Sequence, residues 1–154
     1  MKAYDIRRSD RAQSESTAVE ILKKGSYGVL STVGADGYPY GVPVNYVYDD
    51  GKIYFHCAKN EGHKQENMRF SGKVSFTVVT KSDVISEKFT TGYESAVAFG
   101  IASKIVTDKE KALRLLVKKY SPDFINEGES YIKGGFERTD VFAVEIERLT
   151  AKAN

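Results

Sequence analysis

Residues 27–57 read YGVLSTVGADGYPYGVPVNYVYDDGKIYFHC, and this stretch decides the fold. Apolar and polar side chains alternate in three runs, and a period of two is typical of half-buried β-strands. Asp36-Gly37 and Asp50-Gly51 separate the runs, and Asp-Gly pairs favour the tight turns of hairpins. The three predicted strands are 27–33, 38–48 and 53–57. Tight turns cannot join parallel neighbours, so the stretch predicts an antiparallel meander.

The rest of the chain continues the β pattern and adds short helices. Further strands are predicted at 73–80, 95–102 and 141–149, with a polar loop over 81–91. Helices are predicted at 17–24, at 62–70 with Asn60 as N-cap, and from a capping box at 107–110 to Tyr120. Six antiparallel strands predict a mainly β fold, a small β-barrel with flanking helices, because closure removes exposed sheet edges. We expect one domain over residues 1–154, with 1–13 as a solvated N-terminal arm.

Composition argues against several classes of partner. Hydrophobic residues make up 41% of the chain and charged residues 29%, which is ordinary for a globular protein. The net charge of +2 is too small to indicate binding to nucleic acid or to an anionic membrane. Cys57 is the only cysteine, so an intrachain disulfide is impossible and a reducing compartment is expected. The chain has no signal-peptide pattern and no long apolar run, and we therefore expect a cytoplasmic protein.

A candidate phosphate site follows the third predicted strand. Residues 54–64 read as a strand, a loop and the first turn of a helix. Both histidines of the chain, His56 and His63, lie at this junction, together with Lys64. A helix N-terminus carries unpaired backbone N–H groups and a partial positive charge, an arrangement that suits a phosphate. An ordinary strand-to-helix connection with a solvated lysine would give the same local sequence.

Other catalytic arrangements find no support in the sequence. There is no Gly-x-Ser-x-Gly nucleophile motif, and the glycine-rich stretches lack nucleotide-binding spacings. His56, Cys57 and His63 offer three possible metal ligands, but no fourth accompanies them, and we predict no metal site.

Strand alternation predicts which side chains share a face. His56 and Ala58 should point to one side of the third strand and Cys57 to the other. Pro43 and Asn45 should share a face of the second strand, and a proline is tolerated chiefly near a sheet edge or a bulge. Asn45 either caps a local bulge or hydrogen-bonds to a planar ring that carries carbonyl and imide groups.

These motifs together resemble one known family. Residues 36–48 (DGYPYGVPVNYVY), residues 51–58 (GKIYFHCA) and the triplet Gly62-His63-Lys64 resemble the FMN-binding split-barrel family, relatives of pyridoxamine 5′-phosphate oxidase. The particular similarity is to its nitroimidazole-resistance branch, the 5-nitroimidazole reductase-like proteins. Residues 90–95 (TTGYES) and 138–153 also look like that branch. The resemblance covers nearly the whole chain.

The resemblance implies a single six-stranded antiparallel split-barrel domain, a homodimer, and FMN bound at the dimer interface. His63 and Lys64 would bind the phosphate, because they match an arginine-lysine pair of the oxidases. Asn67, one turn further on, and Ser95, at the position of an oxidase glutamine, are additional candidates. The implied cofactor-binding residues are Val42, Pro43, Val44, Asn45 and Tyr46 along the flavin edge, His56, Cys57 and Ala58 on the next strand, and His63, Lys64, Asn67 and Ser95.

Departures from the family pattern narrow the expected activity. Pyridoxamine phosphate oxidases carry a C-terminal substrate motif of arginine and histidine with a tryptophan nearby. This chain has no Trp, and residues 147–154 contain no histidine. The differences argue against vitamin B6 oxidation.

We expect an FMN-dependent reductase for nitroaromatic or similar small acceptors, in which the flavin carries the chemistry. No side chain stands out as an acid or base, and His56 is the best candidate for a proton donor or substrate contact. Two alternatives stay open: a heme-binding or heme-degrading split-barrel protein, and a flavin-binding protein without turnover.

Overall fold

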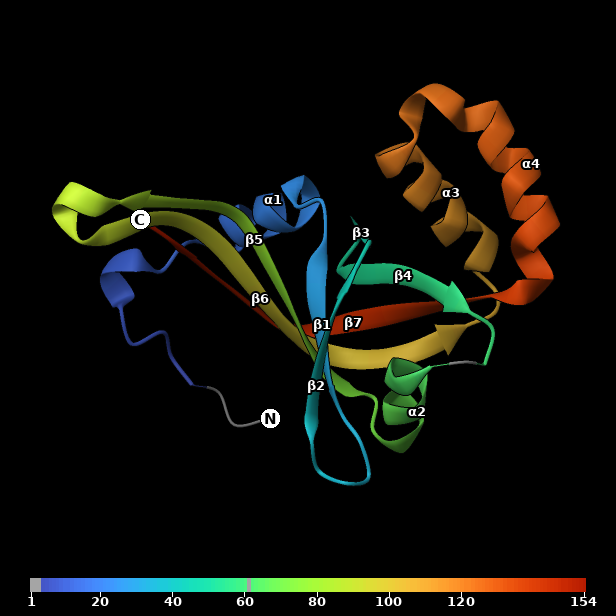
Figure 1. Ribbon diagram of the computed structural model, residues 1–154, viewed down its shortest axis with the longest axis horizontal. Helices are drawn as coiled ribbons and strands as arrows, with labels where there is room; N and C mark the ends of the chain where they lie inside the picture. The colour runs from blue at the N-terminus through green and yellow to red at the C-terminus, as the bar shows by residue number, and fades with distance from the viewer. Residues whose placement is uncertain (1–3, 61) are drawn as a thin grey trace.

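The computed structural model describes residues 4–60 and 62–154. Within these residues, one antiparallel sheet of seven strands is flanked by four α-helices (Figure 1). The strands are β1 (Gly28–Val33), β2 (Pro39–Val44), β3 (Val47–Asp49), β4 (Lys52–Ala58), β5 (Lys73–Ile85), β6 (Thr90–Ile105) and β7 (Thr139–Ala153). The helices are α1 (Glu15–Lys24), α2 (His63–Phe70), α3 (Lys109–Tyr120) and α4 (Ile125–Gly135). The predicted mainly β class is confirmed, with seven strands in place of six.

The extra strand arises because the predicted strand 38–48 divides into two. The order of the sheet is β2-β1-β5-β6-β7-β4-β3, so β2 and β3 lie at opposite edges. Asn45 and Tyr46 alone join them along the chain. Such a link spans roughly 11 Å at most, and the sheet must therefore curl until its two edges approach each other. The hairpins β1–β2 and β3–β4 are confirmed, but the predicted continuous meander is wrong.

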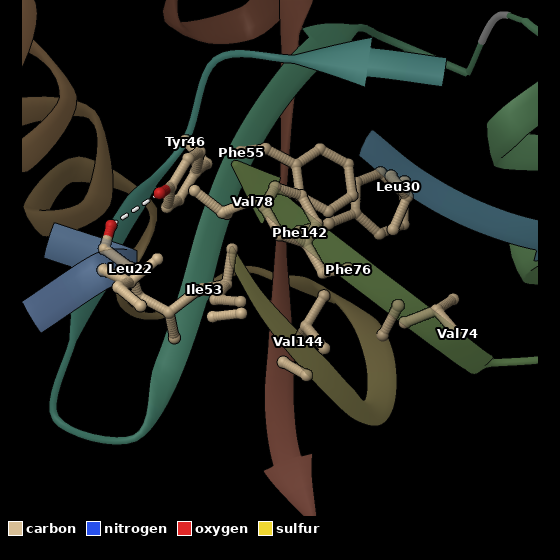
Figure 2. Close-up of a cluster of buried hydrophobic side chains, with 14 of the residues drawn as sticks. Leu22, Leu30, Tyr46, Ile53, Phe55, Val74, Phe76, Val78, Phe142 and Val144 are labelled. Carbon is tan, nitrogen blue, oxygen red and sulfur yellow. Dashed lines mark hydrogen bonds between the residues drawn. The ribbon is translucent and has the colours of Figure 1, made fainter. Parts of the chain in front are cut away.

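Tyr46 secures this crossing between the edges. It is fully buried, and its hydroxyl donates to the carbonyl of Leu22 in α1 at 2.5 Å (Figure 2). Its backbone N–H donates to the Tyr120 hydroxyl at 2.9 Å. That hydroxyl oxygen also lies 2.8 Å from the carbonyl of Tyr46 and 2.7 Å from that of Ser26, and it shares its single proton between them. Both backbone groups of the crossing residue are thus satisfied, as burial requires.

Lys119 packs against the same crossing residue from the end of α3. Its ammonium nitrogen lies 3.9 Å from the centroid of the Tyr46 ring, within the range of a cation–π contact. Burial lowers the pKa of Lys119 to about 8, because the charged form loses its hydration.

Two hydrophobic cores lie on the two sides of β4. Ile53 and Phe55 point into the barrel, whereas Tyr54 points outward beneath α3 and α4. The barrel core includes Leu22, Leu30, Tyr46, Ile53, Phe55, Val74, Phe76, Val78, Phe142 and Val144 (Figure 2). The outer core comprises Val47, Tyr54, Ala112, Leu113, Leu116, Ile132, Val141 and Ala143. The predicted alternation along β4 is confirmed. At residues 53–55 the barrel core covers one face of the strand and the outer core covers the other.

The N-termini of two helices differ from the predicted caps. Helix α1 begins at Glu15, because the Ser14 hydroxyl accepts the backbone N–H of Thr17 at 3.2 Å. Helix α2 begins after Gly62, not at an Asn60 cap. Asn60 instead adopts a left-handed conformation with φ 55°, and its backbone N–H donates to Asp140.

The predicted loop over 81–91 is instead part of a long hairpin. The β5–β6 ladder continues from Lys81 paired with Glu94 to Ile85 paired with Thr90. This arm projects beyond the barrel beside the C-terminus (Figure 1). Its mostly exposed side chains lack the apolar alternation that identifies a half-buried strand, and backbone pairing alone defines it.

Helix α4 is absent from the sequence-based expectations, because three glycines lower the helix propensity of its segment. Gly128 has a packing role there. A Cβ at that position would lie 2.5 Å from a methyl group of Val117, so glycine permits the close approach of α3 and α4. Arg114 of α3 joins Glu129 of α4 through two hydrogen bonds of 2.8 and 3.1 Å.

The N-terminal arm is attached to the end of β7. Ala12 forms a β-bridge with Lys152, and the N–H of Gln13 donates to the carbonyl of Ala151 at 3.0 Å. Residues 1–3 of the predicted arm lie outside the described residues. None of the helices in the described part of the chain is long and apolar enough to cross a membrane.

The Tyr120 hydroxyl should stabilise the closed barrel through its bond to the Tyr46 N–H. Tyr120→Phe removes the partner of the Tyr46 N–H, and we expect unfolding in urea to lose about 1–3 kcal/mol of stability. Tyr131→Phe, at an exposed position of α4, is the matched control and should leave stability unchanged. Equal stability of the two variants would contradict the proposed role of the Tyr120 hydroxyl.

Candidate functional site

The end of β4 presents the first group of candidate residues. His56 and Ala58 are exposed on the outer side of the strand, whereas Cys57 turns inward and packs against the barrel core. Gln65 of α2, only 2% exposed, places its amide nitrogen 3.1 Å from the Cys57 sulfur and 2.5 Å from the Ala58 carbonyl. Gln65 thereby fixes α2 against the end of β4. No pattern in the sequence distinguishes this glutamine from a solvated one.

The N-terminus of α2 lies between β2 and β4. The ring of His63 packs on Tyr40 of β2, with 4.1 Å between centroids and an angle of 30° between planes. On the other side, Lys64 is near enough to His56 of β4 to affect its ionisation. Gly62 enters the helix with φ 97°, a conformation that favours glycine. Barrel closure therefore brings β2 and β4 to this helix end, one on each side.

A cavity of about 580 Å³ opens between the end of β4 and α4. One wall is His56, Cys57 and Ala58, and the other is Ser130, Tyr131, Gly134, Gly135, Arg138 and Thr139. Among the lining residues Arg138 carries the permanent charge, and none is acidic. A smaller cavity of about 150 Å³ adjoins it beneath α3 and is also lined by His56. His56 therefore lies at the junction of the two cavities.

Burial affects the ionisation of the groups at this junction. His56 is exposed on the outer side of β4, yet nearby protein displaces part of the hydration of its ring and lowers its pKa below the usual value, and the Lys64 cation lowers that pKa further. Burial raises the pKa of the Cys57 thiol, while Lys64 acts in the opposite direction. Both side chains are therefore predominantly neutral at pH 7.

Asn67 holds the helix rather than facing open solvent. It is 3% exposed, and its amide nitrogen donates to the Thr32 hydroxyl of β1 at 3.0 Å. It also lines a cavity of about 360 Å³ together with His63, Asp36 and Glu66. The two acidic side chains make this cavity less suitable for a phosphate than the helix end beside it.

The predicted flavin-edge residues divide into two sets. Val42 and Val44 turn inward against the barrel core, and Tyr46 is fully buried, which leaves no surface of Tyr46 for a cofactor. Pro43 and Asn45 are exposed on the outside. Pro43 lies on an edge strand, as the sequence predicts.

Ser95 lies away from the end of β4 within one chain. Ser95 is ten residues from Ile105 on β6. Ile105 pairs with Val141 of β7, and Val141 in turn pairs with His56 of β4. Ten strand residues extend roughly 33 Å. Ser95 instead shares the outer side of the barrel with Pro43, because alternate residues of neighbouring strands point the same way.

We call this surface the outer sheet face. Its cross-strand rows are Pro43, Val29, Thr77 and Val97, then Gly41, Ser31, Ser75 and Phe99, with Ser95 and Ile101 at its ends. Phe99 and Ile101 are 36% and 37% exposed. A cavity of about 480 Å³ opens here beside Phe99. Among the described residues, no cluster of three or more His, Cys, Asp or Glu side chains gathers to hold a metal.

Comparison with solved structures finds the same fold in flavin- and heme-related proteins. A candidate 5-nitroimidazole antibiotic resistance protein from Bacteroides thetaiotaomicron aligns with TM-score 0.75 at 20% identity, covering 91% of this chain and 84% of its own. The flavocytochrome Anf3 from Azotobacter vinelandii aligns with TM-score 0.80 at 18% identity, covering 98% and 72%. The FAD and heme binding protein from Mycobacterium smegmatis aligns with TM-score 0.80 at 17% identity, covering 94% and 73%.

At these identities the alignments show a shared fold alone. A search of curated protein sequences gives no match. The family model for pyridoxamine 5′-phosphate oxidase, in contrast, matches residues 14–153, which is nearly the whole chain. The chain therefore belongs to the pyridoxamine 5′-phosphate oxidase family, with its split-barrel fold.

Proposed function

We propose that this protein binds FMN and acts as a flavin-dependent reductase of small aromatic acceptors such as nitroaromatic compounds. The observation that carries the proposal is the N-terminus of α2, which presents His63 and Lys64 between β2 and the end of β4. The flavocytochrome and the FAD and heme binding protein that share the fold support a flavin as the ligand, and the candidate nitroimidazole resistance protein supports a nitroaromatic acceptor.

The donor set at this helix end fits a phosphate monoester. The first N–H groups of a helix point out of its N-terminus, and the helix dipole favours an anion there. In α2 the N–H groups of Gln65 and Glu66 bond to the Gly62 carbonyl, so those of His63 and Lys64 are the ones that point outward. Lys64 adds an ammonium group, and His63 adds a ring nitrogen. FMN has a phosphate that riboflavin lacks, and this site would distinguish the two.

The cavity beside the helix end suits a small organic acceptor. Its volume of about 580 Å³ lies within the range of small-molecule sites. Arg138 and the neutral His56 supply hydrogen-bond donors on opposite walls, and Tyr131 supplies an aromatic surface. Bound FMN would supply electron transfer. The chain would orient the acceptor, and the N–H of the neutral His56 ring would donate a hydrogen bond to the acceptor atom that is reduced.

We propose further that the protein is a homodimer with FMN at the interface. The outer sheet face offers the partly exposed apolar side chains of Phe99 and Ile101 and a cavity that Phe99 lines, a surface suited to a second copy. Pro43 and Ser95 lie on the same face, although Ser95 is far from His56 within one chain. Packing of two copies through this face would bring Ser95 to the interface, where it could contribute to a shared site.

A heme-binding protein is the second candidate. Two structural relatives are a flavocytochrome and a protein that binds FAD and heme. His56, partly exposed with a neutral imidazole, has the ligand chemistry for heme iron. The visible spectrum of the loaded protein separates a flavin band from a heme Soret band. Oxidation of NAD(P)H in the presence of a nitroaromatic acceptor separates a reductase from a flavin carrier.

Lys64→Ala should weaken FMN binding and spare riboflavin. A charged hydrogen bond contributes about 1.5–3 kcal/mol, so the FMN dissociation constant should rise roughly 10- to 150-fold in a fluorescence titration. Lys118→Ala, which removes an exposed lysine from α3, is the matched control and should leave both affinities unchanged. Unchanged FMN affinity in Lys64→Ala would exclude this helix end as the phosphate site.

His56 should titrate below the ordinary histidine pKa. Burial and the Lys64 cation both favour the neutral ring, so its NMR titration midpoint should lie below about 6.5 in the ligand-free protein. Removing the cation in Lys64→Met should move the midpoint upward. Because the folded pKa is lowered, His56 contributes stability above pH 6.5 that is lost as the pH falls. A midpoint at or above 6.5 would contradict the role of neutral donor.

A further inference from the structure

A buried carboxylate lies directly behind the connection between β4 and α2. Asp140, near the start of β7, is 2% exposed. One carboxylate oxygen accepts the backbone N–H of Asn60 at 2.9 Å, and the other pairs with the Lys104 ammonium at 2.7 Å. Lys104 also approaches the Asn60 side-chain oxygen at 3.5 Å. The predicted flavin-binding residues do not include Asp140 or Lys104.

The connection needs such support because of its backbone conformation. Asn60 and Gly62 both have positive φ angles, 55° and 97°, and Asn60 is a non-glycine residue in the left-handed region. The residue before it is also held, since the Lys59 N–H donates at 3.0 Å to the carbonyl of Arg138, the residue that precedes β7. Contacts with Arg138 and Asp140 therefore hold the chain at Lys59 and Asn60, shortly before α2 begins.

The pairing with Lys104 also addresses an electrostatic problem. Burial raises the pKa of Asp140, but the Lys104 contact and the Asn60 N–H lower it by more, so the carboxylate is ionised. An isolated carboxylate near a phosphate site would repel the ligand. Lys104 neutralises that charge, and the carboxylate can hold the connection without weakening anion binding there.

We propose that Asp140 is a positioning residue for phosphate recognition: its carboxylate, balanced by Lys104, holds the Asn60 turn so that the N-terminus of α2 meets the ligand phosphate. The inference rests on the proposed function, because it takes FMN as the ligand and the helix end as its phosphate site. Asp140 itself touches no ligand. Asp140 acts on the ligand site through the backbone of Asn60. For this role the carboxylate oxygen that accepts the Asn60 N–H is more important than the negative charge of the side chain.

The test compares FMN and riboflavin affinities in two Asp140 variants. Asp140→Ala removes the acceptor for the Asn60 N–H, and the FMN dissociation constant should rise about tenfold, with riboflavin affinity changed by less than about twofold. Asp140→Asn keeps an acceptor oxygen, and FMN affinity should return to within about threefold of the original. Asp49→Ala, which breaks the 2.8 Å pair with Lys111 at the other end of β4, is the matched control.

Three results would overturn the inference. If Asp140→Ala weakens FMN and riboflavin equally, the residue only stabilises the fold. If Asp140→Asn behaves like Asp140→Ala, the carboxylate acts through charge and not as an acceptor. If the unsubstituted protein binds riboflavin as tightly as FMN, the proposed phosphate site fails, and the inference fails with it.

A second variant covers the case in which Asp140→Ala does not fold. Lys104→Met keeps the Asp140–Asn60 bond but removes the balancing cation from a half-exposed position. FMN affinity should then fall about threefold or more, because an unbalanced negative charge would lie behind the phosphate site, while riboflavin affinity stays the same. Equal changes for both ligands would contradict the positioning role.

Discussion

Tyr46 joins the two edges of one sheet, and the rest of the structure depends on this crossing. Its side chain is sealed into the core by Leu22, while the Tyr120 hydroxyl satisfies both of its backbone groups. The short link between β2 and β3 forces the sheet to close, and closure in turn brings β2 toward the end of β4. Helix α2 packs at this junction, with its N-terminus beside Tyr40. The candidate phosphate site is thus a consequence of how the barrel closes.

Buried polar contacts then fix the position of the N-terminus of α2. Gln65 ties α2 to β4, Asn67 ties it to β1, and Asp140 holds the turn that precedes it. Each of these side chains is at most 3% exposed, and each has a hydrogen-bond partner, so each adds specificity of geometry at little desolvation cost. The exposed His63 and the half-buried Lys64 are held in place by these buried residues. His56, on the adjoining strand, presents a neutral ring to the cavity beneath α4.

Local patterns identified much of this arrangement, and long-range contacts account for what they missed. Asp-Gly turns marked both hairpins, and strand alternation placed His56 outside and Cys57 inside. The division at Tyr46 could not be predicted, because alternation continues through a strand that changes partners. Helix α4 was not predicted, because its glycines lower the helix propensity of the segment. Packing against α3 stabilises this helix. Gln65 and Asp140 look like solvated residues in sequence, and their roles depend on segments up to 80 residues away. The proposed role of Ser95 cannot be judged from one chain, because it requires a second copy to bring Ser95 to the shared site.

The central claim is that FMN binds where two copies of the chain meet. Sedimentation velocity of the FMN-loaded protein, recorded in the visible absorption band of the flavin, tests that claim most directly. The account predicts that the flavin absorbance sediments as one species with twice the chain mass of 17.1 kDa. Flavin absorbance that sediments with a single 17.1 kDa chain, or that stays behind as free ligand, would contradict it.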